Sequence, residues 1–446
     1  MLFSICIRAI ERFRPRAIED VNVGCDDSTE ETASREDLDD SSWLERTCDS
    51  LRANTLTLKE LEIDSEEKSL DDGDIVTLCD ALNSNEVVTR LIFRNVDFGE
   101  NENIHLAQVL QNTNSISTVH LEETRGIGQL AVVTALHLNT TSSVRVLHLK
   151  GNLIDQSSSQ AIGQMLKTNR SLSELKLCHN SLDADSVSFI AQGLKRNYGL
   201  RVLDLLGNGL DDVGVSKISN ALAHNESLEF LCLDFNDFGY FGVKSIASML
   251  CTNQHIKELH LFGNRIDSCG AQTLADALLK NSSLETLILS FNQIGDAGAA
   301  ALAKALTVNK SLTKIWFPSN SVGIDGLRAF GECLPRMKVL EELHVGHFFD
   351  SDAVEALLKG LRLNTSLSVL YMESPVHDET SIEDKVDFYL RLNKSGRSLL
   401  KSPDAPTSLW AKALERANVN EGERGAPDVL YFMLRQRPDL FNFVRR

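Results

Sequence analysis

The strongest constraint on the fold is a segment that recurs at a fixed interval. The pattern Leu-x-x-Leu-x-Leu-x-x-Asn-x-Leu, with other aliphatic residues allowed in place of leucine, occurs seven times in succession. The segments begin at residues 144, 172, 200, 228, 256, 284 and 312, so every step is 28 residues. The phase extends back to 116, 88 and 58 and forward to 340 and 367, which makes about twelve repeats. Such periodicity predicts one continuous solenoid rather than separate globular domains.

Each part of the repeat predicts a local structure. The Leu-x-Leu core has the two-residue period of a short strand. The Asn after it, such as Asn180 or Asn236, suits a turn because its amide can satisfy buried backbone groups. Apolar residues then recur at helical spacing, as in Leu302–Leu306. A second recurring Asn, such as Asn169 or Asn253, precedes the next strand segment, and we expect it to end the helix in the left-handed conformation.

This repeat resembles the ribonuclease-inhibitor type of leucine-rich repeat. The resemblance implies an α/β fold, a right-handed horseshoe-shaped solenoid with a parallel β-sheet on its concave face and helices on its convex face. Parallel strands stack about 4.8 Å apart, whereas packed helices need about 8–10 Å, so the helical side must be the longer arc. The phrase Asn292-Gln-Ile-Gly-Asp-Ala-Gly298 is most similar to the repeat regions of NOD-like receptors and of Ran GTPase-activating protein. The GxxxxGK[ST] motif of a receptor's nucleotide-binding domain does not occur in the sequence.

Composition divides the chain into three parts. Residues 1–50 form an acidic N-terminal arm that we expect to be disordered, because 17–50 carries twelve acidic and only two basic residues. Residues 51–380 form the solenoid. Residues 381–446 are expected to form a helical C-terminal cap over the open end of the core, with helices near 382–393, 408–417 and 427–435.

Charge and cysteine content limit the partner and the compartment. With 45 basic against 63 acidic residues the net charge is −18, which disfavours nucleic acid because binding phosphates needs surplus basic groups. No stretch approaches the roughly 20 apolar residues that span a bilayer, so no membrane partner is expected. Nine cysteines without a disulfide or metal spacing favour a reducing compartment, the cytoplasm or the nucleus. The Arg-rich opening segment leaves organelle import as a weaker alternative.

Strand alternation predicts which residues form a candidate binding face. Positions 3, 5 and 7 of the pattern point to the concave surface. On the central strands these positions hold large apolar and acidic residues, and we predict a partner-binding site made of Phe230, Phe262, Ile288, Trp316, Asp204, Asp234, Glu258 and His260. Exposed aromatic clusters mark partner sites, and the acids imply a partner protein with basic and apolar contacts. Phe235 and Phe291 lie beside the turn Asn and are expected to pack at the rim.

Catalysis and metal binding have less support in the sequence. Cys232 and His260 fall on neighbouring strands about 4.8 Å apart, but no third orienting group or complete ligand set is evident. The same holds for His344 with His347. We therefore predict no catalytic residue, no metal and no cofactor. The favoured function is a non-enzymatic scaffold for protein–protein interaction. The alternative is a GTPase-activating protein for a Ran-like small GTPase, which rests on the resemblance alone.

Overall fold

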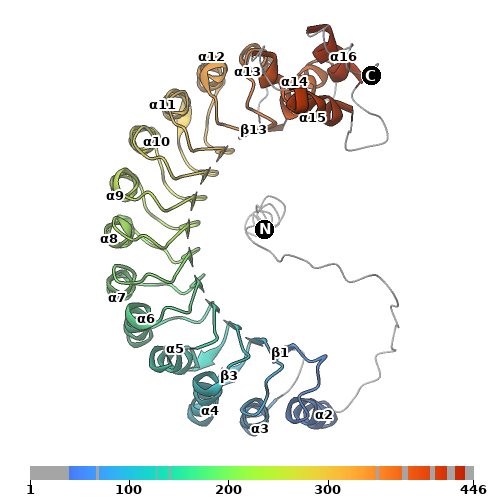
Figure 1. The fold of residues 1–446 in the computed structure, drawn as a ribbon. Coiled ribbons are helices and arrows are strands. Elements are labelled where there is room, and N and C mark those ends of the chain that lie inside the picture. The colour runs from blue at the N-terminus through green and yellow to red at the C-terminus, as the bar shows by residue number, and fades with distance from the viewer. Residues whose placement is uncertain are drawn as a thin grey trace. The chain divides into compact units, whose positions relative to one another are not determined.

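The computed structural model describes residues 40–66, 70–126, 128–139, 142–347, 351–373, 380–401, 407–418 and 427–436. These residues belong to one compact unit, 40–446, in which strands and helices alternate along the chain (Figure 1). Within the described residues, twelve parallel strands form one sheet in the order β1-β2-β4-β6-β7-β8-β9-β10-β11-β12-β13-β14. The prediction of about twelve repeats, one strand each, is confirmed.

The strands follow the predicted repeat phase. The bounds in the large sheet are β1 Glu60–Asp64, β2 Arg90–Arg94, β4 Thr118–Glu122, β6 Val146–Lys150, β7 Glu174–Lys176, β8 Val202–Asp204, β9 Phe230–Cys232, β10 Glu258–His260, β11 Thr286–Ile288, β12 Lys314–Trp316, β13 Glu342–His347 and β14 Val369–Glu373. A second, two-stranded parallel sheet pairs β3 (Asp97–Phe98) with β5 (Arg125–Gly126). In the central strands each residue pairs with the one 28 positions later, as in Leu231 with Leu259. Equivalent positions of the repeats therefore stand side by side.

A helix follows each strand of the solenoid up to β14. The helix bounds are α2 Asp40–Arg52, α3 Asp72–Leu82, α4 Glu100–Asn112, α5 Gly128–Leu138, α6 Gln156–Thr168, α7 Ala184–Leu194, α8 Asp212–Leu222, α9 Tyr240–Thr252, α10 Ser268–Leu278, α11 Gly295–Leu306, α12 Ile324–Cys333, α13 Ser351–Leu361, α14 Thr380–Lys394, α15 Thr407–Asn418 and α16 Pro427–Gln436. Short 3₁₀ turns lie at Leu334–Arg336 and Arg397–Lys401. None of the helices in the described segments is both long and apolar enough to span a bilayer.

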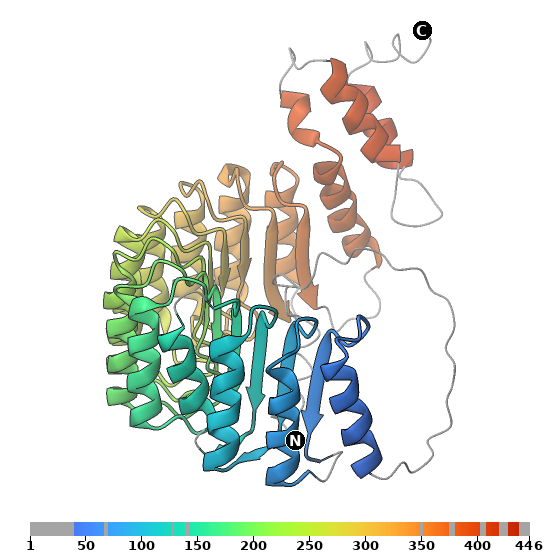
Figure 2. The ribbon, with the colours of Figure 1, turned by 60° about the horizontal axis from the view of Figure 1, so that its bottom comes forward.

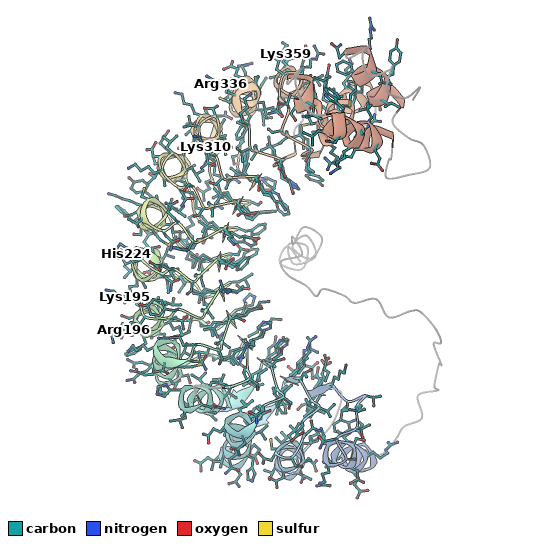
Figure 3. All side chains as sticks on the ribbon, in the orientation of Figure 1. Lys195, Arg196, His224, Lys310, Arg336 and Lys359 are labelled. Atoms are coloured by element: carbon teal, nitrogen blue, oxygen red, sulfur yellow. The ribbon has the colours of Figure 1, made fainter. Side chains whose placement is uncertain are left out.

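The repeats curve with the strands on the inner side and the helices on the outer side (Figures 1 and 2). Leucines at positions 4 and 6 of the pattern point between the two layers, and Leu231, Leu233 and Leu259 are fully buried there. Side chains fill the space between the layers, while the labelled Lys195, Arg196 and His224 lie on the helical side (Figure 3). The concave face is therefore formed by the side chains at positions 3, 5 and 7.

Asparagines at the turn after the strand form a ladder through the sheet. Asn236 donates from Nδ2 to the carbonyl of Leu205 (3.2 Å) and to that of Leu233 (3.0 Å). Its Oδ1 accepts from the backbone N–H of Asn208 (3.2 Å) and of Leu210 (2.9 Å). The side chain is buried, with 4% exposed. One amide thus satisfies buried groups of two successive repeats, as the sequence predicted.

The second asparagine column differs from the prediction. Asn253 follows helix α9 with φ −75° and ψ 126°, which is extended and not left-handed. Its Nδ2 donates to the carbonyls of Leu222 and Asn225, both at 2.8 Å, and its Oδ1 accepts from the backbone N–H of His255 and Ile256. The expected left-handed conformation was wrong because this Asn joins neighbouring helix ends with its side chain, and an extended backbone turns the chain towards the next strand.

A left-handed residue lies instead at position 8 of the pattern, immediately before the turn position that is Asn in the central repeats. This column has φ between 50° and 69° at Asn95, Glu123, Gly151, His179, Gly207, Phe235, Gly263, Phe291 and Ser319. Glycine alternates there with larger residues. A Cβ on Gly207 would lie 2.4 Å from His179 Nδ1, and a Cβ on Gly263 would lie 2.9 Å from the Phe235 ring. Gly207 and Gly263 therefore leave room for the ring of the preceding repeat.

The N-terminal boundary of the fold is a correction to the sequence analysis. The predicted disordered arm, 1–50, overlaps helix α2, in which Cys48 and Leu51 are buried in the main core. The carbonyl of Leu51 also accepts from Asn85 Nδ2 (2.8 Å), so α2 takes the place of a preceding repeat's helix. The acidic surroundings concealed the apolar spacing of this helix. Residues 1–39, the rest of the predicted arm, lie outside the described residues.

The three predicted C-terminal helices are present as α14, α15 and α16. Helix α14 covers the end of the main core, because Val386 is buried in it and Asn393 Nδ2 donates to the carbonyl of Leu367 (2.7 Å). Helices α15 and α16 pack around Trp410 in a second, smaller core that includes Leu392 of α14. The cap thus has an apolar cluster of its own, formed by α15 and α16 against α14, the helix that covers the end of the solenoid core.

We expect Asn236→Ala to lower the free energy of unfolding by about 1–3 kcal/mol, because it leaves buried backbone groups of two repeats without partners. Urea unfolding followed by circular dichroism measures this change. Asn220→Ala is the matched control, since Asn220 is exposed on helix α8 and should change stability little. Equal midpoints for the two variants would contradict a structural role for the ladder.

Candidate partner-binding face

The predicted site residues lie together on neighbouring strands of the concave face. Strand pairing aligns position 5 across β8 to β14, and the row reads Asp204, Cys232, His260, Ile288, Trp316, His344 and Tyr371. Position 3 aligns Phe230, Glu258 and Thr286 in the same way. Asp234 and Phe262 follow β9 and β10 at position 7. The register therefore places all eight predicted residues on one continuous surface.

The burial of this surface is greater than the sequence suggested. Ile288, Asp204 and His260 were expected to be exposed, but only 4%, 3% and 7% of each is accessible. Phe230, Phe262, Trp316, Asp234 and Glu258 are partly exposed. The physical reason is the strand spacing of about 4.8 Å, at which large side chains on neighbouring strands cover one another. The accessible part of the face is therefore smaller than the row of outward-pointing residues.

One aromatic stack forms across β12, β13 and β14. The rings of Trp316 and His344 are stacked with centroids 4.3 Å apart, and those of His344 and Tyr371 are 5.3 Å apart. Glu342 fixes the stack, because its Oε1 accepts from Trp316 Nε1 (2.9 Å) and is 2.8 Å from His344 Nε2. These contacts hold three rings in place before any partner arrives. His344 and Tyr371 belong to this cluster although the predicted site omitted them.

Glu342 is held as a carboxylate in this setting. The hydrogen bond with His344 lowers its pKa, and Lys314, whose Nζ is 3.8 Å from Oε2, lowers it further against the opposing effect of burial. The stack therefore has a fixed negative charge at its base.

A second aromatic group lies at the rim, where the strands end. The Phe262 ring lies between Phe235 and Phe291, with centroids 4.8 Å and 4.9 Å away. The expectation that Phe235 and Phe291 pack at the rim is confirmed. Phe291 is nevertheless 42% exposed and is the most accessible ring of the three. Sequence reasoning left it out of the site, although the alternation of glycine with phenylalanine before the turn Asn was a visible signal.

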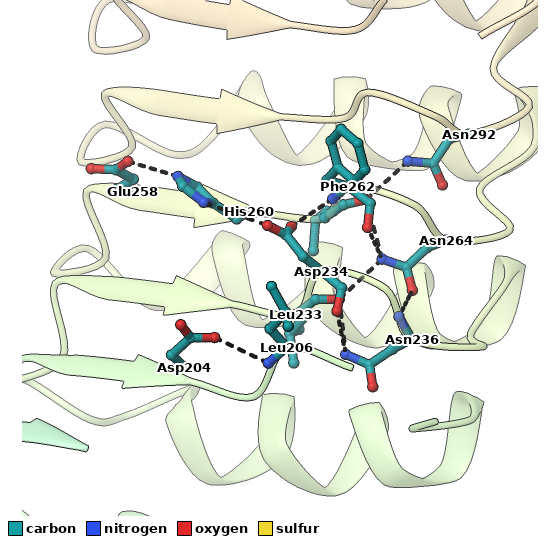
Figure 4. A network of polar contacts seen from close by, with 11 residues as sticks. Asp204, Leu206, Leu233, Asp234, Asn236, Glu258, His260, Phe262, Asn264 and Asn292 are labelled. Carbon is teal, nitrogen blue, oxygen red and sulfur yellow. Dashed lines mark hydrogen bonds and ion pairs between the residues drawn. The ribbon is translucent and has the colours of Figure 1, made fainter. Parts of the chain in front are cut away.

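A polar cluster surrounds His260 on β10 (Figure 4). Its Nε2 is 2.7 Å from Glu258 Oε1, and its Nδ1 is 3.8 Å from Asp234 Oδ2. Burial alone would lower the pKa of His260, but the hydrogen bond to Glu258 and the charge of Asp234 raise it above its ordinary value. Burial raises the pKa of Asp234.

Cys232 lies beside this cluster as a protonated thiol. Burial and the charges of Asp204 and Asp234 raise its pKa well above the ordinary value. A nucleophilic Cys–His pair needs a thiolate, so this environment is unsuitable for one.

Comparisons with known proteins agree with this architecture. A model described as "Leucine Rich repeat" matches residues 200–219, 252–275 and 280–303. The chain therefore carries leucine-rich repeats, and its strands and helices form a leucine-rich-repeat solenoid. Repeats of this class generally mediate protein–protein interaction.

One solved structure similar to the chain is leiomodin-1 actin-binding site 2, with 20% identity and a TM-score of 0.26. The similarity covers 30% of this chain and 80% of that one, and at this level it says nothing about what the chain binds. No curated protein sequence matches the chain.

We expect the folded protein to lose stability in mild acid because of His120 on the concave face. The rings of His120 and His148 are stacked, with their centroids 4.0 Å apart. Burial and the neighbouring His148 lower the pKa of His120 to about 3. The unfolded chain takes up this proton near pH 6.5. Stability is therefore complete above that pH and falls as the pH decreases towards 3. Between pH 7 and pH 5, the free energy of unfolding of His120→Phe should fall by about 1–2 kcal/mol less than that of the wild type, as measured by urea unfolding. Identical losses would show that His120 takes up its proton as readily in the folded protein as in the unfolded one.

Proposed function

We propose that this protein is a non-enzymatic scaffold that binds a partner protein on its concave face, across β9 to β14. The observation that carries the proposal is the stack of Trp316, His344 and Tyr371 with its fixed carboxylate, Glu342. Aromatic residues held rigidly cost little conformational entropy when they bind, which is the property of interface hot spots. The rim group of Phe235, Phe262 and Phe291 extends the same surface.

The charge of the surface indicates the chemistry of the partner. The exposed fraction of the side chain is 19% for Glu342, 15% for Asp234 and 25% for Glu258. Carboxylates beside aromatic rings suit Arg or Lys, whose charged end pairs with the acid while the apolar stem lies on a ring. We therefore expect a partner segment that alternates basic and apolar residues. Such complementarity favours a fast, salt-dependent association.

The double variant Trp316→Ala, Phe262→Ala tests this surface. We expect each truncation to cost about 2 kcal/mol or more, so that each weakens partner binding about 30-fold. Partners captured by the immobilised wild-type chain are identified, purified and titrated against both proteins. Phe241→Ala is the control, because Phe241 is an aromatic residue 68% exposed on helix α9. Equal affinities for the wild type and the folded double variant would place the binding site elsewhere.

Activation of a small GTPase is the alternative function. It is favoured by the resemblance of residues 292–306 to Ran GTPase-activating protein, and it would also use the repeats as a binding surface. We expect no acceleration when GTP hydrolysis by Ran and related GTPases is measured with and without micromolar amounts of this protein. A large increase in the hydrolysis rate would replace the scaffold proposal with this one.

A further inference from the structure

One group of potential metal ligands lies on the concave face at β9 and β10. Among the described residues, Cys232, Asp234 and His260 form the group whose ligand atoms all lie within 4.8 Å of one another. Two of the three residues come from one repeat, at positions 5 and 7, and the third comes from the next repeat at position 5. We propose that this group binds a divalent transition-metal ion of the zinc type, independently of any partner protein.

The distances are close to those that such an ion requires. Zinc bonds of about 2.0–2.3 Å to nitrogen, oxygen and sulfur place tetrahedral ligand atoms about 3.4–3.6 Å apart. His260 Nδ1 and Asp234 Oδ2 are already 3.8 Å apart. All ligand atoms lie within 4.8 Å of one another, so they must approach by about 1 Å to reach the separation that an ion requires. Three protein ligands leave a fourth position for water.

The surrounding contacts orient the ligand atoms. Glu258 Oε1 lies 2.7 Å from His260 Nε2, so Nδ1 is the ring nitrogen that faces Asp234. The Phe262 backbone N–H donates to Asp234 Oδ1 at 2.7 Å, which leaves Oδ2 facing His260 (Figure 4). A carboxylate on the far nitrogen of a ligating histidine is the usual arrangement in zinc sites. Glu258 is thus a positioning residue.

The charge of the cluster also favours a cation. Asp204, Asp234 and Glu258 surround His260, and Asp204 and His260 are buried. Buried carboxylates without full compensation are costly, and a bound divalent ion offsets that cost.

The type of ion follows from the mixture of ligands. A thiol and an imidazole are poor ligands for Mg²⁺ or Ca²⁺, which prefer oxygen. One sulfur, one nitrogen and one oxygen suit Zn²⁺ or Co²⁺.

The chain itself offers a matched control three repeats further on. His344 has the same contact with a glutamate two residues earlier, Glu342 at 2.8 Å, as His260 has with Glu258. At the positions equivalent to Cys232 and Asp234, however, the repeat before that of His344 has Trp316 and Pro318. The two histidines thus share their setting and differ in the two other ligands.

The experiment is a titration of the full-length, reduced protein with Co²⁺, followed by displacement with Zn²⁺. The wild type should bind one Co²⁺ with the intense visible absorption of tetrahedral cobalt and a thiolate-to-cobalt band in the near ultraviolet. Absence of these bands in the folded wild type at micromolar Co²⁺ would overturn the proposal, whatever the variants do.

The variants separate this site from other cysteines and histidines. Cys232→Ser should lose the thiolate band, and His260→Gln and Asp234→Asn should lose tetrahedral binding. Glu258→Gln should weaken the affinity about 10- to 100-fold while keeping the band. His344→Gln and Cys269→Ser, a substitution of an exposed cysteine, should bind Co²⁺ as the wild type does. Equal loss of binding in His344→Gln and His260→Gln would also overturn the proposal.

As a second measurement, Zn²⁺ should raise the melting temperature of the wild type and of His344→Gln, because an ion that binds only the folded protein stabilises it. The melting temperature of His260→Gln should not change with Zn²⁺. This comparison holds even where a variant is less stable than the wild type, since each protein is compared with itself.

Discussion

The structure depends on the hydrogen bonds that the recurring asparagines make between successive repeats. The Nδ2 group of each turn Asn reaches a carbonyl 31 residues earlier, as Asn236 does to Leu205 and Asn264 to Leu233. The second column repeats this geometry at the helix ends, where Asn253 reaches Leu222 and Asn281 reaches Leu250. An insertion of one residue in a repeat would shift both amides away from their acceptors. The constant 28-residue step of the central repeats therefore follows from the need to satisfy buried backbone groups at both ends of each of these repeats.

A constant step also determines the chemistry of the concave face. Because equivalent positions align across strands, the side chain at position 5 always meets the position 5 side chains of its two neighbours. At about 4.8 Å spacing, flat rings fit this arrangement by stacking, which Trp316, His344 and Tyr371 do. Where the row changes from rings to Cys232 and Asp204, ionisable groups come equally close. Burial, and after it the charge of the neighbouring carboxylates, raises the pKa values of Cys232 and Asp234. The aromatic surface and the polar cluster are two outcomes of one geometric rule.

The sequence predicts the parts of the fold that repeat, and it fails where neighbouring repeats differ. Leu231 and Leu233 are buried as their positions require, and the turn asparagines bond as expected. The burial of Ile288 could not be predicted from its own repeat, because the side chains of His260 and Trp316 on the neighbouring strands cover it. Helix α2 was missed for a related reason: its apolar residues meet a core that only the following repeat supplies. The third ligand, Asp234, became evident only when strand register and loop position were known together.

The same reasoning explains why, among the described residues, the group of Cys232, Asp234 and His260 lies on a single pair of repeats. A metal site needs three different side chains at defined positions of two neighbours, whereas the repeat needs only leucine and asparagine at the positions that build the fold. Positions 5 and 7 are free of that structural requirement. Hydrophobic packing therefore does not require Cys232 and Asp234 at these positions. The equivalent residues three repeats later, Trp316 and Pro318, show that the solenoid forms equally well without the ligands. A thiol, a carboxylate and an imidazole meeting at β9 and β10 are therefore better explained by binding than by folding.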